Sequence, residues 1–88
     1  MWEERCLTVC NARGLHCRVA TCLKAIADGF AGKILLVAGE QEVDGDSVLA
    51  ILGLGLERGA QVTVRAEGTG AATALDAIAA LLALEQDP

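Results

Sequence analysis

The spacing of apolar residues changes repeatedly along this chain of 88 residues, and no other feature limits its fold as strongly. Residues 61–66 place an apolar side chain at every second position, which is the period of a half-buried strand. Residues 71–84 repeat leucine and isoleucine at helical spacing among alanines, which favours a helix. Both periods within one short chain predict a domain that mixes helices with strands.

The same periods, together with short apolar runs and turn or N-cap residues, place the remaining elements. We expect further strands at residues 6–10, 34–38 and 41–43, and further helices at residues 17–28 and 48–54. The resulting order is strand, helix, strand, strand, helix, strand, helix. Residues 1–88 should therefore form a single α+β domain, in which three helices cover one face of a four-stranded antiparallel sheet.

Composition defines the core and excludes several classes of protein. Hydrophobic residues make up 53% of the chain but aromatic residues only 2%, so Ala, Val, Leu and Ile must fill the core. A disordered segment would be poor in these residues. The longest apolar run, residues 77–84, is far too short for membrane insertion. The N-terminus lacks the pattern of a signal peptide, and we expect a cytoplasmic protein.

The charge balance argues against nucleic acid as a partner. The net charge is −5, and the seven Lys and Arg residues are scattered along the sequence. Nucleic-acid binding relies on clustered basic side chains that neutralise phosphates. The acidity is typical of a small protein that stays in solution.

Four cysteines lie in the first quarter of the chain, and their spacing predicts no metal site. Cys6, Cys10, Cys17 and Cys22 form no C-x-x-C pair, and the chain has one histidine. Zinc sites usually pair close cysteines and then repeat the pair or add histidines. A disulfide framework needs a secretory context, which is absent. We expect free thiols, no metal and no cofactor.

The one histidine, His16, is a candidate nucleophile because of its position in the sequence. It follows a glycine–leucine pair and directly precedes the helix expected at residues 17–28. The free N–H groups of a first helical turn form an anion site, and a neutral imidazole is a nucleophile toward phosphorus. Arg18 can add a guanidinium group, and the backbone of Cys17 an N–H donor. This pattern favours a carrier that accepts and hands on a group over an enzyme.

Three segments resemble the HPr family, the histidine-containing phosphocarriers of the bacterial phosphoenolpyruvate-dependent sugar phosphotransferase system. Residues 11–20 (NARGLHCRVA) are similar to the family's active-centre signature, and residues 46–55 (DSVLAILGLG) to its second signature. Residues 59–68 resemble its last strand. The likeness covers essentially the whole chain and implies the HPr-like open-faced β-sandwich.

The resemblance implies phosphoryl transfer through His16. A donor kinase of the Enzyme I type, which uses phosphoenolpyruvate, would phosphorylate His16 on Nε2 to give a tele-phosphohistidine. An acceptor protein of the IIA type would then take the group, while Arg18 and the backbone of Cys17 hold the phosphate. The protein would be a monomer, and a substrate of transferases rather than an enzyme.

The second signature implies a regulatory site and a docking surface. Ser47 corresponds to the serine that a dedicated kinase, opposed by a phosphatase, modifies in part of the family; serine is also a favoured helix N-cap. The resemblance implies that side chains from two helices contact the partner proteins: Thr21, Leu23, Val48, Leu49 and Leu52.

Two residues depart from the family pattern. Cys17 stands where a small residue is usual, and Val19 where proline or alanine is usual. A thiol at a helix N-terminus is prone to oxidation, because the helix stabilises its thiolate. A disulfide between Cys10 and Cys17 that silences the carrier is therefore a hypothesis.

Three other functions stay open. The main alternative is a regulatory or binding module with the HPr fold and no phosphotransfer. Residues 46–48 (DSV) resemble the Asp-Ser-Leu of acyl carrier proteins, but that family is all-helical. A cysteine hydrolase that combines Cys17 or Cys22 with His16 would lack a third residue to orient the base.

Overall fold

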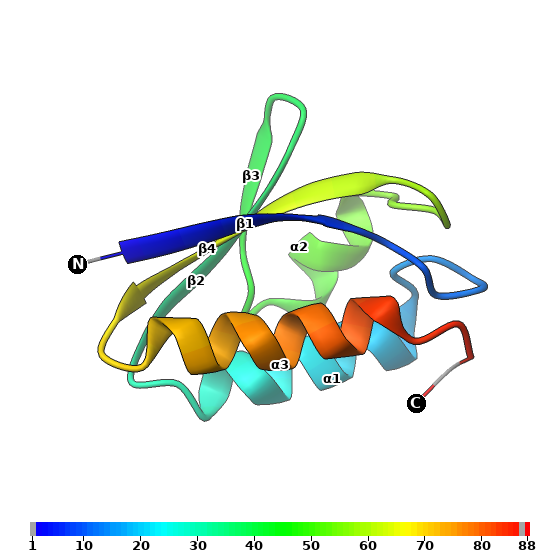
Figure 1. Cartoon of the computed structure of the whole chain (residues 1–88). Helices are drawn as coiled ribbons and strands as arrows, with labels where there is room; N and C mark the ends of the chain where they lie inside the picture. Colours follow the sequence, from blue (N-terminus) through cyan, green and yellow to red (C-terminus); the bar gives the residue numbers. More distant parts are fainter. Residues whose placement is uncertain (1, 87) are drawn as a thin grey trace.

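Four strands form one antiparallel sheet in the computed structural model, which describes residues 2–86 and 88. The strands are β1 (Trp2–Thr8), β2 (Gly32–Ala38), β3 (Gln41–Asp44) and β4 (Gln61–Gly68). Their order across the sheet is β1-β4-β2-β3, so the last strand in sequence lies between the first two (Figure 1). All neighbouring pairs are antiparallel, as predicted.

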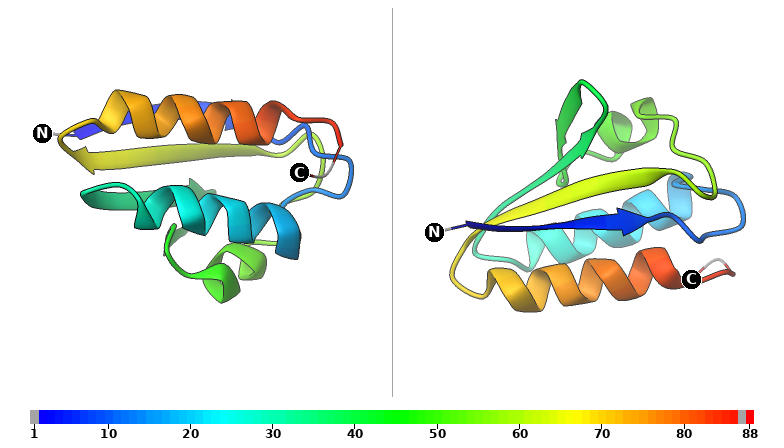
Figure 2. Two further views of the ribbon diagram at one scale, coloured as in Figure 1. Left: turned by 90° about the horizontal axis from the view of Figure 1, so that it is seen from below. Right: turned by 45° about the horizontal axis from the view of Figure 1, so that its top comes forward.

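Three helices lie on one face of this sheet. Helices α1 (Cys17–Asp28) and α3 (Ala71–Ala83) pack side by side in opposite directions, and the short α2 (Val48–Gly53) lies next to α1 (Figure 2). In the described part of the chain, no helix covers the other face, which confirms the open-faced α+β sandwich. None of the helices within residues 2–86 has the length and apolarity needed to cross a membrane.

Small aliphatic residues fill the space between the sheet and the helices. Along β4, the alternate residues Val62, Val64 and Ala66 are at most 1% exposed. Throughout the described residues, all buried hydrophobic side chains are Ala, Val, Leu or Ile, as the composition predicted. Burial of this apolar surface is the main favourable term in folding, and here it comes without help from aromatic rings.

Helix α1 has the predicted bounds, whereas the first strand does not. Strand β1 covers Trp2–Thr8 instead of residues 6–10. The charged run at residues 3–5 hides the strand pattern, yet all seven residues pair with β4, because the neighbouring strand supplies the backbone partners. Val9 and Cys10 leave the sheet and begin the loop to α1. The other elements differ from the predicted bounds by at most two residues at either end.

Candidate functional site

His16 is the N-cap residue of α1. Its backbone is extended (φ −91°, ψ −176°), and the helix starts at the next residue. The backbone N–H of Arg18 donates to Nδ1 of the imidazole, with 3.4 Å between the two nitrogens. The N–H of Ala20 donates to the carbonyl oxygen of His16 at 2.9 Å. Side chain and main chain of His16 therefore both face N–H donors of the first turn.

The ring nitrogen that faces these donors decides where a phosphoryl group fits. A neutral imidazole that accepts a hydrogen bond at Nδ1 carries its proton on Nε2, so the lone pair available for attack is on Nδ1. A group bonded to Nδ1 would lie next to the Arg18 N–H of the first turn. The hydrogen bond therefore favours Nδ1 of His16 over the Nε2 of the predicted tele-phosphohistidine as the site of the phosphoryl group.

The turn before His16 requires glycine. Gly14 has φ +70°, and a Cβ atom at this position would meet the carbonyl oxygen of Leu56 and lie 2.7 Å from Cα of Glu57. The next residue, Leu15, is buried and donates its N–H to the same Leu56 oxygen at 2.9 Å. The loop between α2 and β4 thus holds one side of the segment that carries His16.

The other side of this segment rests on the C-terminal end of α3. Asn11 is 0% exposed, and its Nδ2 donates to the carbonyl oxygens of Leu81 and Leu84 at 3.1 and 2.9 Å. The N–H groups on either side of Asn11 donate to two further carbonyl oxygens at the same end. This role of Asn11 is not visible in the sequence, because turn composition does not distinguish a buried asparagine from an exposed one.

One exposed face of α1 continues from His16. Cys17, Arg18, Thr21 and Cys22 line a shallow surface hollow, and their helical spacing places all four on this face. The hydroxyl of Thr21 donates to the carbonyl oxygen of Cys17 at 2.7 Å. Cys22 was not predicted as part of this surface, although its position one turn after Arg18 was the signal that could have found it.

Leu23 does not belong to this surface, and its predicted contact with partners is wrong. Its side chain is 0% exposed and lies in the core with Val19 and Ala27. These three residues recur every fourth position, so they form the stripe of α1 that faces the sheet. A residue on that stripe cannot touch a second protein without unfolding of the helix.

Helix α2 begins at Ser47 and presents apolar side chains to the outside. The hydroxyl oxygen of Ser47 accepts a first-turn N–H at 3.2 Å, as expected of an N-cap. Leu49 is 82% exposed, whereas Val48 and Leu52 are half-buried against the core. Ile51 is fully buried and holds the helix to the domain. Helix α2 packs on α1, the helix that His16 caps, so these predicted docking residues and His16 belong to neighbouring helices.

The four cysteines are free and occupy different environments. Cys6 and Cys17 are exposed, and Cys10 and Cys22 are half-buried. Cys10 and Cys17 line separate surface hollows, and the proposed disulfide between them stays a prediction. Within residues 2–86 and 88, no three side chains of the metal-binding types come together.

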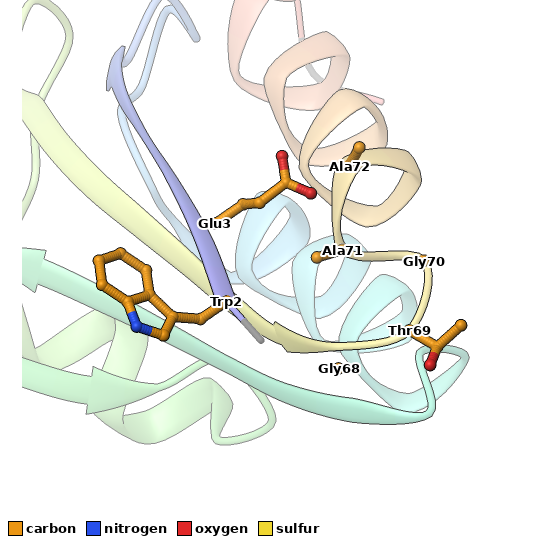
Figure 3. Close-up of a pocket in the computed structure, with 7 residues that line it drawn as sticks. All are labelled: Trp2, Glu3, Gly68, Thr69, Gly70, Ala71 and Ala72. Atoms are coloured by element: carbon orange, nitrogen blue, oxygen red, sulfur yellow. The ribbon is translucent and has the colours of Figure 1, made fainter.

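A different hollow lies at the opposite end of the sheet, where β4 turns into α3 (Figure 3). Trp2 and Glu3 line one side of it and residues 68–72 the other. None of the predicted site residues lines this hollow, because β1 runs from it toward the loop that precedes His16. The predicted site at the start of α1 therefore lies outside this hollow, next to the exposed face of α1.

Comparison with known proteins assigns this chain to a family. A family model described as the PTS HPr component phosphorylation site matches residues 3–83. The chain belongs to the HPr family. This HPr-family chain is 43% identical to the phosphocarrier protein NPr of Shewanella violacea, over 90% of its own length and 87% of that protein. It is 30% identical to the phosphocarrier protein HPr of Cupriavidus necator, over 91% and 90% of the two chains.

Solved HPr structures share the whole architecture. The crystal structure of a phosphocarrier protein HPr from Bacillus anthracis matches with a TM-score of 0.87 and 27% sequence identity, over 92% of this chain and 96% of that one. The predicted HPr resemblance, and the phosphocarrier function of the phosphotransferase system that accompanies it, are confirmed. The four-stranded sheet excludes the all-helical acyl carrier alternative.

Proposed function

We propose that this HPr-family protein carries its phosphoryl group on Nδ1 of His16. The hydrogen bond from the Arg18 N–H to Nδ1, at 3.4 Å, carries the proposal, because it places the nucleophilic nitrogen against the amides of a helix start. Phosphate oxygens bind well there, since those N–H groups lack partners within the helix and the helix dipole is positive at this end. The N–H of Cys17 and the guanidinium group of Arg18 supply further donors.

Each transfer exchanges one bond to phosphorus for another. The Nδ1 lone pair attacks the phosphorus held by the donor, and the bond to the donor's leaving atom breaks with its electron pair staying on that atom. A nucleophile of the acceptor then attacks the phosphorus on His16, and the electron pair of the N–P bond returns to Nδ1. The protein ends unchanged, which makes it a carrier and a substrate of transferases rather than an enzyme.

The proposed partners are a donor kinase of the Enzyme I type and an acceptor of the IIA type. Both would dock on the exposed face of α1 at Thr21 and on the apolar surface of α2, where Leu49 is 82% exposed and Val48 and Leu52 border it. Exposed apolar patches of this kind are typical of protein contact sites. A monomer in the cytoplasm, where free cysteines stay reduced, suits a shuttle between two proteins.

Ser47 is the proposed regulatory site for a kinase and a phosphatase. Its half-buried hydroxyl already accepts a backbone N–H at the start of α2. A phosphate there would add a charge of about −1.5 to −2 directly beside the docking residue Val48. That charge would change how partners bind this surface without touching the imidazole.

Labelling with phosphoenolpyruvate and the general donor kinase tests the proposal. The protein should take up one acid-labile phosphoryl group, which His16→Ala abolishes and Ser47→Ala retains. Arg18→Ala should slow labelling about tenfold or more, because a hydrogen bond to a charged group contributes about 1.5–3 kcal/mol. NMR of the labelled imidazole should place phosphorus on Nδ1.

The control is a well-characterised HPr labelled in the same reaction. If that HPr is labelled and this protein is not, the alternative of an HPr-fold binding module without phosphotransfer is correct. If label appears on Nε2, the carrier function stands but the assignment of Nδ1 fails.

A further inference from the structure

The side chain of Asn11 lies at the base of the segment that carries His16. Within the described residues, it is the one polar side chain that is fully buried. Burial of an amide is unfavourable unless hydrogen bonds replace its contacts with water. Both protons of Nδ2 are used, toward the carbonyl oxygens of Leu81 at 3.1 Å and Leu84 at 2.9 Å.

These carbonyl groups belong to the end of α3, where a helix has no donors of its own for its last carbonyls. Many helices solve this with a left-handed glycine that closes the last turn. Helix α3 does not, since Leu84 at its C-cap is extended (φ −67°, ψ 129°). The N–H of Leu84 donates to the carbonyl oxygen of Leu81 at 3.3 Å, and the amide of Asn11 adds two further donors from a position 70 to 73 residues away in sequence.

A chain of hydrogen bonds leads from Asn11 to His16. The N–H of Gly14 donates to the carbonyl oxygen of Asn11 at 2.9 Å. The N–H of His16 in turn donates to the carbonyl oxygen of Gly14 at 3.0 Å. Leu15, between them, is held by Leu56. The position of the imidazole relative to the first turn of α1 therefore depends on where Asn11 is held against α3.

The other polar atom of the amide gives a second indication. Oδ1 of Asn11 is buried and has no hydrogen-bond partner among the residues that the structure describes. An unsatisfied buried acceptor is destabilising, and such groups in native proteins call for an explanation. The explanation here is that the loop needs the two Nδ2 donors at this point, which no apolar residue of similar size could supply.

We propose that Asn11 is the positioning residue for phosphoryl transfer at His16. By fastening the loop to the C-terminal end of α3, it sets Nδ1 of His16 against the N–H groups of α1. Asn11 does not contact the phosphoryl group and acts only through the loop. The inference rests on the proposed role of His16.

Two variants of Asn11 and one control test this role. Asn11→Leu keeps the side-chain volume and removes both donors, and Asn11→Ser keeps one hydroxyl donor without adding bulk. Ile34→Val trims a buried residue of β2 that pairs with the end of β4 remote from His16. All three are compared with the wild type at a temperature where denaturation curves show the native state alone.

Two measurements separate positioning from mere stability. One is kcat and KM for phosphorylation by the donor kinase, and the other is the half-life of phosphohistidine in the isolated protein. We expect both Asn11 variants to lose about 10- to 100-fold in kcat at nearly unchanged KM, since displacement of a reacting group by about 1 Å costs rate on this scale. The phosphohistidine half-life should shorten, and Ile34→Val should match the wild type in both.

Folded Asn11 variants that transfer phosphate with the wild-type kcat would overturn the proposal and leave Asn11 a purely structural residue. If Asn11→Leu does not fold, the comparison of Asn11→Ser with Ile34→Val decides in the same way. Failure of the wild type itself to take up label is a distinct result, because it removes the role of His16 and not only that of Asn11.

Discussion

Helices α1 and α2 begin alike and differ in how firmly they are held. His16 caps α1 and Ser47 caps α2, and each side chain accepts a first-turn N–H, at 3.4 and 3.2 Å. Helix α1 then runs for 12 residues and buries four of them, whereas α2 runs for six and buries only Ile51. The nucleophile thus sits on the firmly packed helix, and the exposed apolar surface on the loosely packed one.

This difference matches the two tasks. A nucleophile must be in place before its partner arrives, because small displacements cost rate. A docking side chain contributes when the partner covers it, so it must be exposed beforehand. Leu23 of α1 and Leu49 of α2 are the same residue type, at 0% and 82% exposure. Substitutions at these positions should therefore separate stability from recognition.

The largest effect on stability is expected for Leu23→Ala. Removal of this fully buried side chain should lower the free energy of unfolding by about 2–5 kcal/mol, through lost apolar contacts and the cavity left behind. Urea denaturation measures this loss. KM for the donor kinase should stay at the wild-type value under conditions where the variant is folded. A raised KM in the folded variant would show that Leu23 does contribute to binding of the donor kinase.

A smaller and local effect is expected for Ser47→Ala. Loss of the N-cap hydrogen bond should cost about 1 kcal/mol, and Ser47→Gly only a few tenths. Amide hydrogen exchange should accelerate within residues 48–53 and stay slow in α1, because α2 has a single buried anchor. Equal acceleration in both helices would show that they open as one unit and that α2 is held as firmly as α1.

The smallest effect on stability is expected for Leu49→Ala. An exposed side chain should change the free energy of unfolding by no more than about 0.5 kcal/mol. Its loss from the docking surface should still weaken binding of the donor kinase by about 1 kcal/mol or more, seen as a several-fold rise in KM. Trp2→Ala is the matched control, since Trp2 is 52% exposed at the remote end of the sheet. An equal rise in KM for both variants would locate docking elsewhere.

Local patterns were sufficient for most of the fold. Apolar periods, apolar runs, and turn and N-cap residues predicted all seven elements, because each of these signals belongs to the local sequence and not to a distant neighbour. The N-cap position of His16 was predictable for the same reason. The start of β1 was not, since its residues 3–5 form a strand only through their pairing with β4.

The parts of the site that sequence could not supply depend on side-chain orientation or on contacts between distant segments. Leu23 is a different case: it was assigned to the surface because the resemblance gives its helix a docking role, although its spacing from Val19 and Ala27 places it on the stripe of α1 that faces the sheet. The choice of Nδ1 depends on the rotation of the ring toward the Arg18 N–H. Asn11 acquires its contacts from the C-terminal end of α3, 70 to 73 positions along the chain.

The strand order also determines when the protein can fold during its own synthesis. Strand β4 (Gln61–Gly68) lies between β1 and β2, so neither of the two earlier strands has a backbone partner in the other. A nascent chain that ends before residue 61 can form only the β2–β3 hairpin and isolated helices. Since closure of such distant pairings is slow and sets the folding rate, the sheet and the loop that holds His16 assemble together, after most of the chain has left the ribosome.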